Sequence, residues 1–265
     1  MAIRYGRGHS HERGYGHVRW MMCGSLLLAL GGLSLPIQSS HAATPKAGCV
    51  VLIHGLAGSR WNWIGLPQLL QRSGYHVVNY SYPSRQQRIE VAAQALAPVV
   101  QQCSQRSQQR LPVHLVGHSM GGLLIRAYLQ QYGTAGIGRV VMLGTPNQGT
   151  ELSDPTAQQP YERAVAGWLG PAVAQMTTDV DGFVARLPEP SVSTGIIAGY
   201  LTPAPWLNRR FNTANDGLVA VYSTRLSTMQ DFVLIRSIHS SLPLNVDAQR
   251  QIGWFLATGR FYSPQ

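Results

Sequence analysis

A serine stands at the junction between a strand-like run and a helix-like run, and this junction most constrains the fold. Residues 113–117 form an apolar run typical of a buried strand, and residues 123–132 have the pattern of a helix. Between them, the sequence Gly-His-Ser-Met-Gly places Ser119 at the turn. Side chains at Gly117 or Gly121 would collide with the neighbouring strand and helix in so tight a turn. This context predicts a nucleophile elbow, in which the serine hydroxyl is exposed at a sharp turn. The alternative is a glycine-rich turn whose serine only caps the helix.

Apolar runs and amphipathic segments alternate along most of the chain. Strands are expected at residues 49–54, 76–80, 113–117, 139–143, 194–198 and 232–236, and helices near 63–73, 89–104, 123–132 and 246–258. Continuously apolar strands separated by amphipathic helices are typical of a mostly parallel sheet with helices on both faces. We therefore predict one α/β domain over residues 44–265.

The segment at residues 145–190 interrupts this alternation. It is rich in Pro, Gly, Gln and Thr, with short helical pieces near residues 161–168 and 182–187. A long insertion in a compact domain is usually functional. We expect a cap or lid above Ser119, with a plain surface excursion as the alternative.

The first 43 residues have the pattern of an export signal. A stretch with four arginines precedes an apolar run at residues 20–35, which is followed by Pro36 and small polar residues. The run is shorter than the roughly 20 residues that span a bilayer. We predict a signal peptide cleaved after Ala42 or Ala43, and hence a periplasmic or secreted protein. The alternative is an uncleaved anchor in the inner membrane.

Composition argues against a nucleic-acid partner. The chain is 45% apolar and 12% charged, as in globular proteins, and its formal net charge is +10. Lys46 is the only lysine, and among the arginines of the mature chain only Arg209 and Arg210 are adjacent. Because these arginines form no basic helix or aromatic-interleaved patch, no nucleic-acid site is expected.

Export also affects how the cysteines are interpreted. Once Cys23 leaves with the signal peptide, Cys49 and Cys103 remain as a pair in an oxidising compartment. Both are expected at the end of the sheet opposite Ser119, so a disulfide is possible. Two buried free thiols fit the sequence equally well.

His239 is the candidate base, because it is the only histidine after Ser119. In this architecture the catalytic residues follow the order serine, acid, histidine along the chain. His239 follows the apolar run at 232–236 and precedes the last helix, which places it in a loop at the carboxyl edge of the sheet.

Asp216 is the best candidate for the acid. The carboxylates between the serine and the histidine are Glu151, Asp154, Glu162, Asp179, Asp181, Glu189, Asp216 and Asp231. Asp216 lies in an Asn-Asp-Gly turn that could direct its carboxylate toward an imidazole, although it could also serve only the turn. Asp179 or Asp181 are alternatives if the cap folds back. The acid would orient His239 and stabilise its imidazolium form.

Two backbone N–H groups are candidates for an oxyanion hole. The apolar run at residues 50–53 ends in His54-Gly55 and a loop of small residues, a turn that can direct the N–H of Leu56 into the site. The second donor would be the N–H of Met120, at the N-terminus of the following helix. An ordinary strand-to-loop glycine at Gly55 is the alternative.

Together with a Gly-Thr-Pro-Asn-Gln-Gly segment at residues 144–149, these motifs resemble the α/β-hydrolase superfamily, in particular secreted bacterial lipases and esterases. The resemblance spans nearly all of the mature chain. It implies that Ser119, Asp216 and His239 form a catalytic triad and that Leu56 and Met120 supply the oxyanion hole.

The chain departs from this pattern at two positions. Asn147 stands where histidine is usual in the Gly-Thr-Pro segment. Calcium-dependent lipases of this type carry an aspartate two residues after the catalytic histidine, whereas this chain has Ser241. No structural calcium, other metal or cofactor is expected.

The resemblance implies hydrolysis of carboxylic esters through an acyl-enzyme, with a small-molecule or lipid ester as partner and possible contact with a lipid interface. Lipid esters are favoured because several apolar residues are expected near the site mouth, where they could line an acyl pocket: Trp61, Trp63, Leu66, Trp168, Leu169 and Trp206. The alternatives are an acyltransferase that uses the same triad and a non-catalytic binding module of this fold. The residues favour no particular oligomeric state.

Overall fold

A computed structural model describes residues 48–106, 111–155, 160–202 and 210–263. The chain divides into two units, residues 1–42 and residues 43–265, and all the described residues belong to the second. The predicted signal peptide or anchor at residues 1–43 lies outside them. No helix among the described residues combines the length and the apolar character needed to cross a membrane.

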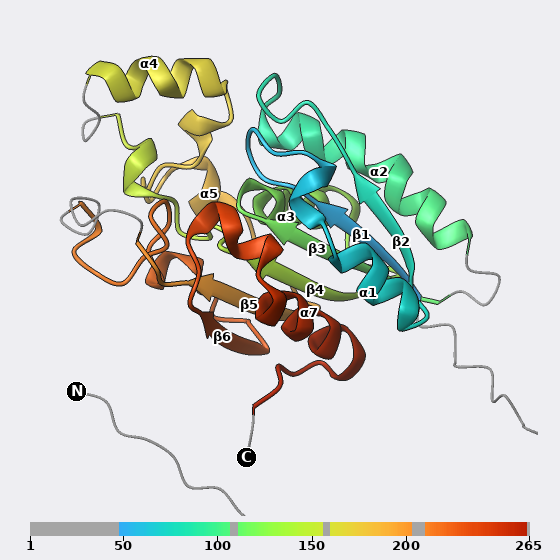
Figure 1. The fold of residues 1–265 in the computed structure, drawn as a ribbon. Coiled ribbons are helices and arrows are strands. Elements are labelled where there is room, and N and C mark those ends of the chain that lie inside the picture. The colour runs from blue at the N-terminus through green and yellow to red at the C-terminus, as the bar shows by residue number, and fades with distance from the viewer. Residues whose placement is uncertain (1–47, 107–110, 156–159, 203–209, 264–265) are drawn as a thin grey trace, which may run out of the picture. The chain divides into compact units, whose positions relative to one another are not determined.

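The described strands form one sheet in which every pairing is parallel (Figure 1). They are β1 (Cys49–Ile53), β2 (His76–Tyr80), β3 (Val113–His118), β4 (Ile137–Leu143), β5 (Ser193–Gly199) and β6 (Asp231–Ile235). Their order across the sheet is β2-β1-β3-β4-β5-β6. Every predicted strand is present, and each end lies within two residues of the prediction. The carboxyl ends of all these strands therefore meet at one edge of the sheet.

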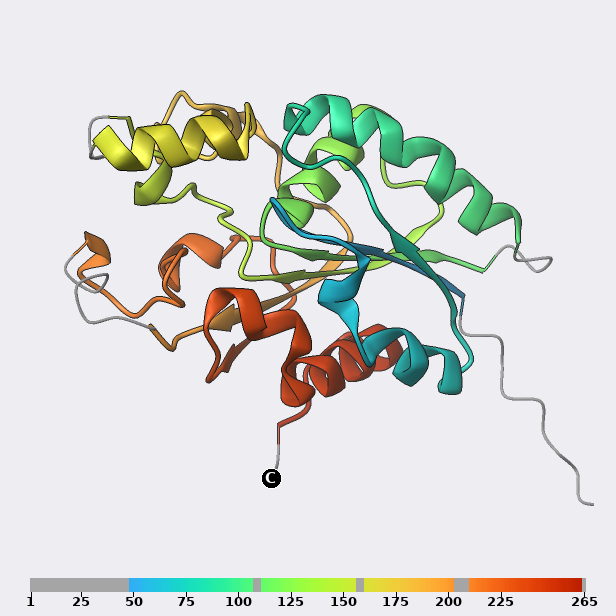
Figure 2. The same ribbon diagram turned by 45° about the horizontal axis from the view of Figure 1, so that its top comes forward.

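Helices cover both faces of the sheet, as predicted. They are α1 (Leu66–Arg72), α2 (Ile89–Gln105), α3 (Met120–Tyr132), α4 (Pro160–Leu169), α5 (Phe183–Arg186) and α7 (Val246–Thr258). Figure 2 shows α2 and α3 on one face and α1 and α7 on the other. Alternate side chains of β1 enter the two cores: Val51 and Ile53 pack on the α2 and α3 side, and Val50 and Leu52 on the α1 and α7 side.

One predicted helix is divided. The segment at 63–73 was expected to be a single helix, but a 3-10 turn, η1 (Arg60–Trp63), precedes α1. Gly65 separates them with φ of 90°, a conformation that glycine adopts at little cost, and a proline opens α1. The division places η1 beside the carboxyl edge of β1, where it can contribute to a site.

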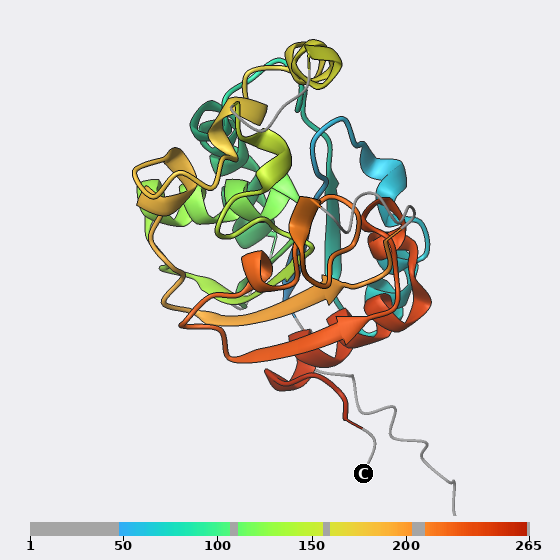
Figure 3. The same cartoon turned by 90° about the vertical axis from the view of Figure 1, so that its left-hand side faces the viewer.

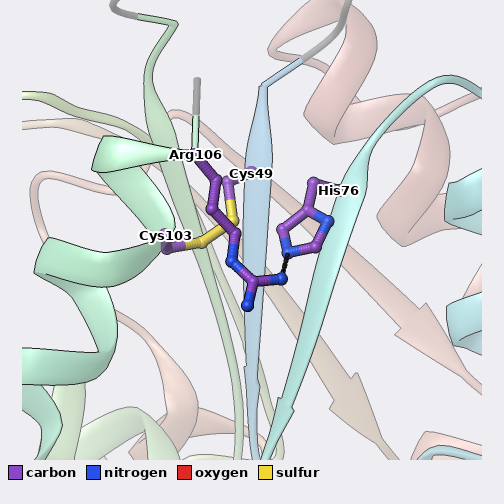
Figure 4. Close-up of a disulfide and its surroundings, with 4 residues drawn as sticks. All are labelled: Cys49, His76, Cys103 and Arg106. Atoms are coloured by element: carbon purple, nitrogen blue, oxygen red, sulfur yellow. Dashed lines mark hydrogen bonds between the residues drawn. A yellow bond between two sulfur atoms is a disulfide. The ribbon is translucent and has the colours of Figure 1, made fainter. Parts of the chain in front are cut away.

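A disulfide joins Cys49, at the start of β1, to Cys103, near the end of α2 (Figure 4). Their Cα atoms lie 5.8 Å apart. Of the two arrangements that the sequence allowed, the structure has the bonded one. Beside it, Nη1 of Arg106 lies 3.3 Å from Nε2 of His76. Since β1 runs from Cys49 toward the carboxyl edge, the disulfide lies at the opposite end from Ser119.

The insertion at residues 145–190 leaves the sheet at the end of β4 and returns at β5. It contains α4, α5 and the 3-10 turns η2 (Glu151–Ser153) and η3 (Val173–Gln175). Figures 1 and 3 show α4 apart from the sheet. The insertion is tied to α2, because Oε1 of Gln175 accepts a hydrogen bond from Ile89 N at 2.7 Å and its Nε2 donates to Glu90 at 2.6 Å.

Candidate active site

Ser119 occupies a sharp turn between β3 and α3. Its φ and ψ are 54° and −126°, an uncommon conformation for a residue with a Cβ atom, and such strain costs roughly 1–3 kcal/mol. The side chain makes no capping hydrogen bond to α3, so the simple helix-cap alternative does not describe it. A Cβ atom at Gly117 would lie 2.7 Å from the backbone of Gly121, as the sequence argument requires.

His239 and Asp216 form a buried pair. Nδ1 of His239 lies 2.8 Å from Oδ2 of Asp216, and the backbone N–H of His239 donates to the carbonyl oxygen of Asp216 at 2.9 Å. The other carboxylate oxygen accepts hydrogen bonds from Leu218 N at 3.1 Å and Val219 N at 2.8 Å. Asp216 thus both closes its own turn and orients the imidazole.

Glycines at the ends of neighbouring strands make room for this pair. A Cβ atom at Gly144 would lie 3.1 Å from Oδ2 of Asp216 and 3.2 Å from Nδ1 of His239. One at Gly199 would lie 2.8 Å from the Cβ of Asp216. Because Gly144 has a φ of 52° as well, two separate constraints require glycine there.

The alternative acids do not approach His239. Asp179 and Asp181 are exposed in the insertion, where Oδ1 of Asp179 accepts a hydrogen bond from the N–H of Asp181 at 3.0 Å. Of the candidate carboxylates in the described part of the chain, Asp216 is the one that pairs with the histidine.

The loop after β1 lies against the serine. A Cβ atom at Gly55 would lie 2.8 Å from the Cβ of Ser119. Within the described residues, the N–H groups of Leu56 and Met120 donate to no other protein atom. Ala57 in this loop also has a positive φ, 54°. Backbone strain and free N–H donors therefore coincide here, as expected for a loop shaped to bind an oxyanion.

His54 holds this loop in place, a role that the sequence argument missed. Its Nδ1–H donates to the carbonyl of Gly55 at 2.9 Å, and its Nε2 accepts from Tyr82 N at 3.3 Å. The rings of His54 and Tyr82 stack with centroids 4.4 Å apart. Burial lowers the pKa of His54, which favours the neutral ring that these two bonds require.

His118 is a second residue whose contribution the sequence did not reveal. Its Nε2–H donates to the carbonyl oxygen of His239 at 3.0 Å, and the two rings lie 4.8 Å apart. Burial, reinforced by the proximity of His239, lowers the pKa of His118 well below its ordinary value. A neutral ring at this position avoids repulsion with a protonated His239.

Arg126 on α3 fixes both ends of the insertion. Its guanidinium donates to the carbonyl oxygens of Asn147 at 2.8 Å, Pro188 at 3.3 Å and Leu187. Burial lowers the pKa of Arg126 to about 10, so the side chain remains charged at neutral pH. Helical periodicity predicts that Arg126 lies on α3. It does not predict that Arg126 binds the insertion, because the residues that it contacts are distant in sequence.

A cavity of about 530 Å³ joins Ser119 and His239 to the insertion. Its apolar lining is Leu56, Ala57, Pro146, Leu152, Val165, Ala166, Leu169, Val173, Met176, Leu218 and Val219. The lining has no Asp, Glu, Lys or Arg among the described residues. The space therefore suits an uncharged, apolar group next to the serine.

The expected lining residues are only partly correct. Leu169 lines the cavity, but Trp63 and Leu66 are buried in the core on the α1 side. Trp61 and Trp168 are exposed to solvent instead. Trp206 lies outside the described residues. Sequence hydrophobicity alone does not distinguish core, cavity and surface positions.

Residues 48–190 match a family model described as the alpha/beta hydrolase fold. Since this match covers more than half of the chain, the protein belongs to the α/β-hydrolase fold family. The fold class predicted from the sequence is thus confirmed. No curated protein matches the sequence.

Several solved structures share this fold. A Bacillus licheniformis lipase in its mature form has a TM-score of 0.66 and 20% identity, with 81% of this chain and 93% of the lipase chain covered. A metagenomic carboxyl esterase has a TM-score of 0.59 and 17% identity, with 74% and 65% covered. Lipase B of Aspergillus fumigatus has a TM-score of 0.59 and 15% identity, with 79% and 52% covered. At these identities, the similarity establishes the fold.

Proposed function

We propose that this chain is a serine hydrolase of carboxylic esters that acts through an acyl-enzyme. The observation that carries the proposal is that His239, which Asp216 holds at 2.8 Å, lines the same apolar cavity as the strained Ser119. The three residues come from three different loops at the carboxyl edge of the sheet, where α/β proteins bind their ligands.

Each residue has one role in the proposed reaction. The Ser119 hydroxyl attacks the ester carbonyl while Nε2 of His239 takes its proton, and the same proton then goes to the leaving alcohol. Asp216 keeps the other imidazole proton on Nδ1 and stabilises the imidazolium. Water then attacks the acyl-enzyme by the same route and releases the acid.

The N–H groups of Leu56 and Met120 would donate hydrogen bonds to the carbonyl oxygen of the ester as negative charge develops on it. Two observations support this assignment: both N–H groups lack a protein acceptor in the described residues, and His54 fixes the loop that carries Leu56. Removing one preorganised donor of this kind typically lowers kcat by about 10²- to 10³-fold.

The cavity supports an uncharged acyl group as substrate, and the lipase and esterase names of the structural neighbours are consistent with such esters. Val165 and Leu218 line the cavity and are also exposed, so the site has access to water. Water can therefore reach an acyl-enzyme at this site. The buried His239–Asp216 pair, with His239 in the same cavity wall as Ser119, favours an enzyme over a non-catalytic module.

We also propose that the mature protein is exported to the periplasm or secreted. The signal-like pattern at residues 1–43 is the main reason. The disulfide between Cys49 and Cys103 supports it, because disulfides persist in oxidising compartments.

Labelling with a fluorophosphonate probe, followed by hydrolysis of p-nitrophenyl esters of graded chain length, tests the proposal. We expect covalent labelling of Ser119 and release of p-nitrophenol. A protein that neither reacts with the probe nor hydrolyses any ester would overturn it. Acyl transfer to an added alcohol in preference to water would identify an acyltransferase instead.

A further inference from the structure

Two exposed tryptophans flank the cavity. Trp61 on η1 is 66% exposed and Trp168 on α4 is 67% exposed. Each directly precedes a residue that lines the cavity, Asn62 and Leu169 respectively. The two tryptophans therefore lie on the two segments that border the opening, although more than a hundred residues separate them.

Each tryptophan carries an arginine over its ring. The guanidinium carbon of Arg60 lies 5.4 Å from the ring centroid of Trp61, and that of Arg85 lies 4.3 Å from the ring centroid of Trp168. Within the described residues, neither arginine forms an ion pair with a carboxylate. A guanidinium that stacks on an indole can still donate hydrogen bonds to a phosphate.

Two aliphatic residues complete this surface. Val165 and Leu218 both line the cavity and are 52% and 47% exposed. The mouth rim thus consists of Arg60, Trp61, Arg85, Val165, Trp168 and Leu218. An exposed apolar surface of this kind around a cavity is typical of an interaction site.

We propose that the mouth rim docks on a lipid surface that carries anionic phosphate headgroups. The tryptophan rings would lie at the interface, where amphipathic aromatic side chains are stable, and the two guanidiniums would contact phosphates. The charge of the mature chain is complementary to such a surface, since residues 44–265 carry 17 Lys and Arg against 10 Asp and Glu, a formal net charge of +7. The rim is continuous with the cavity, so docking would present lipids directly to it.

Docking in this manner requires no movement of the insertion. On α4, Val165, Ala166 and Leu169 line the cavity, whereas Trp168 is exposed and stacks with Arg85. The structure has Trp168 exposed already, so the rim can bind before any conformational change.

Co-sedimentation with vesicles tests this inference separately from the proposed activity. The mature chain, residues 44–265, with Ser119→Ala is mixed with phosphatidylcholine vesicles, with and without phosphatidylglycerol. We expect binding only to the anionic vesicles, with an affinity that falls as salt rises. Arg85→Gln should weaken it about fivefold, the equivalent of about 1 kcal/mol per basic residue near the surface. Trp168→Ala should weaken binding at high salt as well, because its contribution is not electrostatic.

Matched controls come from α7, on the sheet face away from the insertion (Figure 2). Trp254 is 49% exposed and Arg250 has a side chain that is 73% exposed. Trp254→Ala and Arg250→Gln should bind vesicles like the parent. Equal binding by the rim and control variants, or equal binding to neutral and anionic vesicles, would overturn the proposal. Vesicle binding without probe labelling of the parent protein would instead refute only the proposed function.

Discussion

Asp216 and His239 are 23 positions apart in sequence, yet Oδ2 of the first lies 2.8 Å from Nδ1 of the second. Both side chains are buried, and a glycine at the end of β4 leaves the space that they occupy. This pair adjoins the strained serine turn, and the predictions below test what the arrangement does.

Ser119→Ala should abolish ester hydrolysis and probe labelling while leaving the fold intact, because it removes one small, partly exposed hydroxyl. Circular dichroism and labelling of the purified protein measure both outcomes. Ser240→Ala is the matched control, since Ser240 lines the same cavity and should retain labelling. Substantial labelling of the Ser119→Ala protein would locate the nucleophile elsewhere.

Asp216→Asn should lower kcat by about 10⁴, as when a triad acid is converted to an amide. The amide oxygen can still accept from the N–H groups of Leu218 and Val219, so the turn should persist. Steady-state kinetics on a p-nitrophenyl ester measure the effect, and Asp179→Asn is the control. If Asp179→Asn has the larger effect, the acid comes from the insertion.

His118 should make stability depend on pH. Its pKa lies well below 6.5 in the folded chain, so only the unfolded chain binds this proton as the pH falls below that value. Protonation of His118 therefore stabilises the unfolded chain below pH 6.5, and the free energy of unfolding falls there by about 1.4 kcal/mol per pH unit. Above pH 6.5 this loss is absent. His118→Gln should flatten the dependence, which urea unfolding at several pH values measures.

His76→Gln is the control for that experiment, because the side chain of His76 is exposed. Identical slopes for the parent and His118→Gln would contradict the assigned cause.

The length of the preferred acyl chain should depend on the cavity. Each added methylene that enters it contributes about 0.8 kcal/mol, or about fourfold in kcat/KM, until the space is full. Leu169→Trp should shorten the optimum, because Leu169 lines the cavity. Trp168→Ala, next to it but exposed, should leave the profile for soluble esters unchanged. An unchanged optimum in Leu169→Trp would mean that the chain binds elsewhere.

Replacing both Cys49 and Cys103 by alanine should lower the free energy of unfolding by about 4 kcal/mol, the chain-entropy value for a sequence separation of 54. Alanine is chosen instead of serine because both positions are buried, and serine would bury a hydroxyl group there. Turnover at low temperature should not change, because the disulfide lies at the end of the sheet opposite Ser119. Guanidinium unfolding with and without reductant checks the result, and a loss of turnover in the folded variant would contradict it.

Local patterns in the sequence determined the strands, most of the helices and the elbow. The apolar run at 113–117 and the flanking glycines specify a strand, a tight turn and a helix through steric rules that act over a few residues. The bounds of α7 were predicted correctly for the same reason, since Asn245 and Gly259 cap a regular amphipathic repeat.

Only the tertiary structure decided which remote groups meet. Asp216 was one of eight possible carboxylates until the strand ends brought it to His239, and Arg126 acquired its partners only when the insertion folded over α3. The sequence likewise did not distinguish Leu169, which lines the cavity, from Trp168, which is exposed. These outcomes depend on contacts between residues far apart in the chain, and local propensity and periodicity carry no information about such contacts.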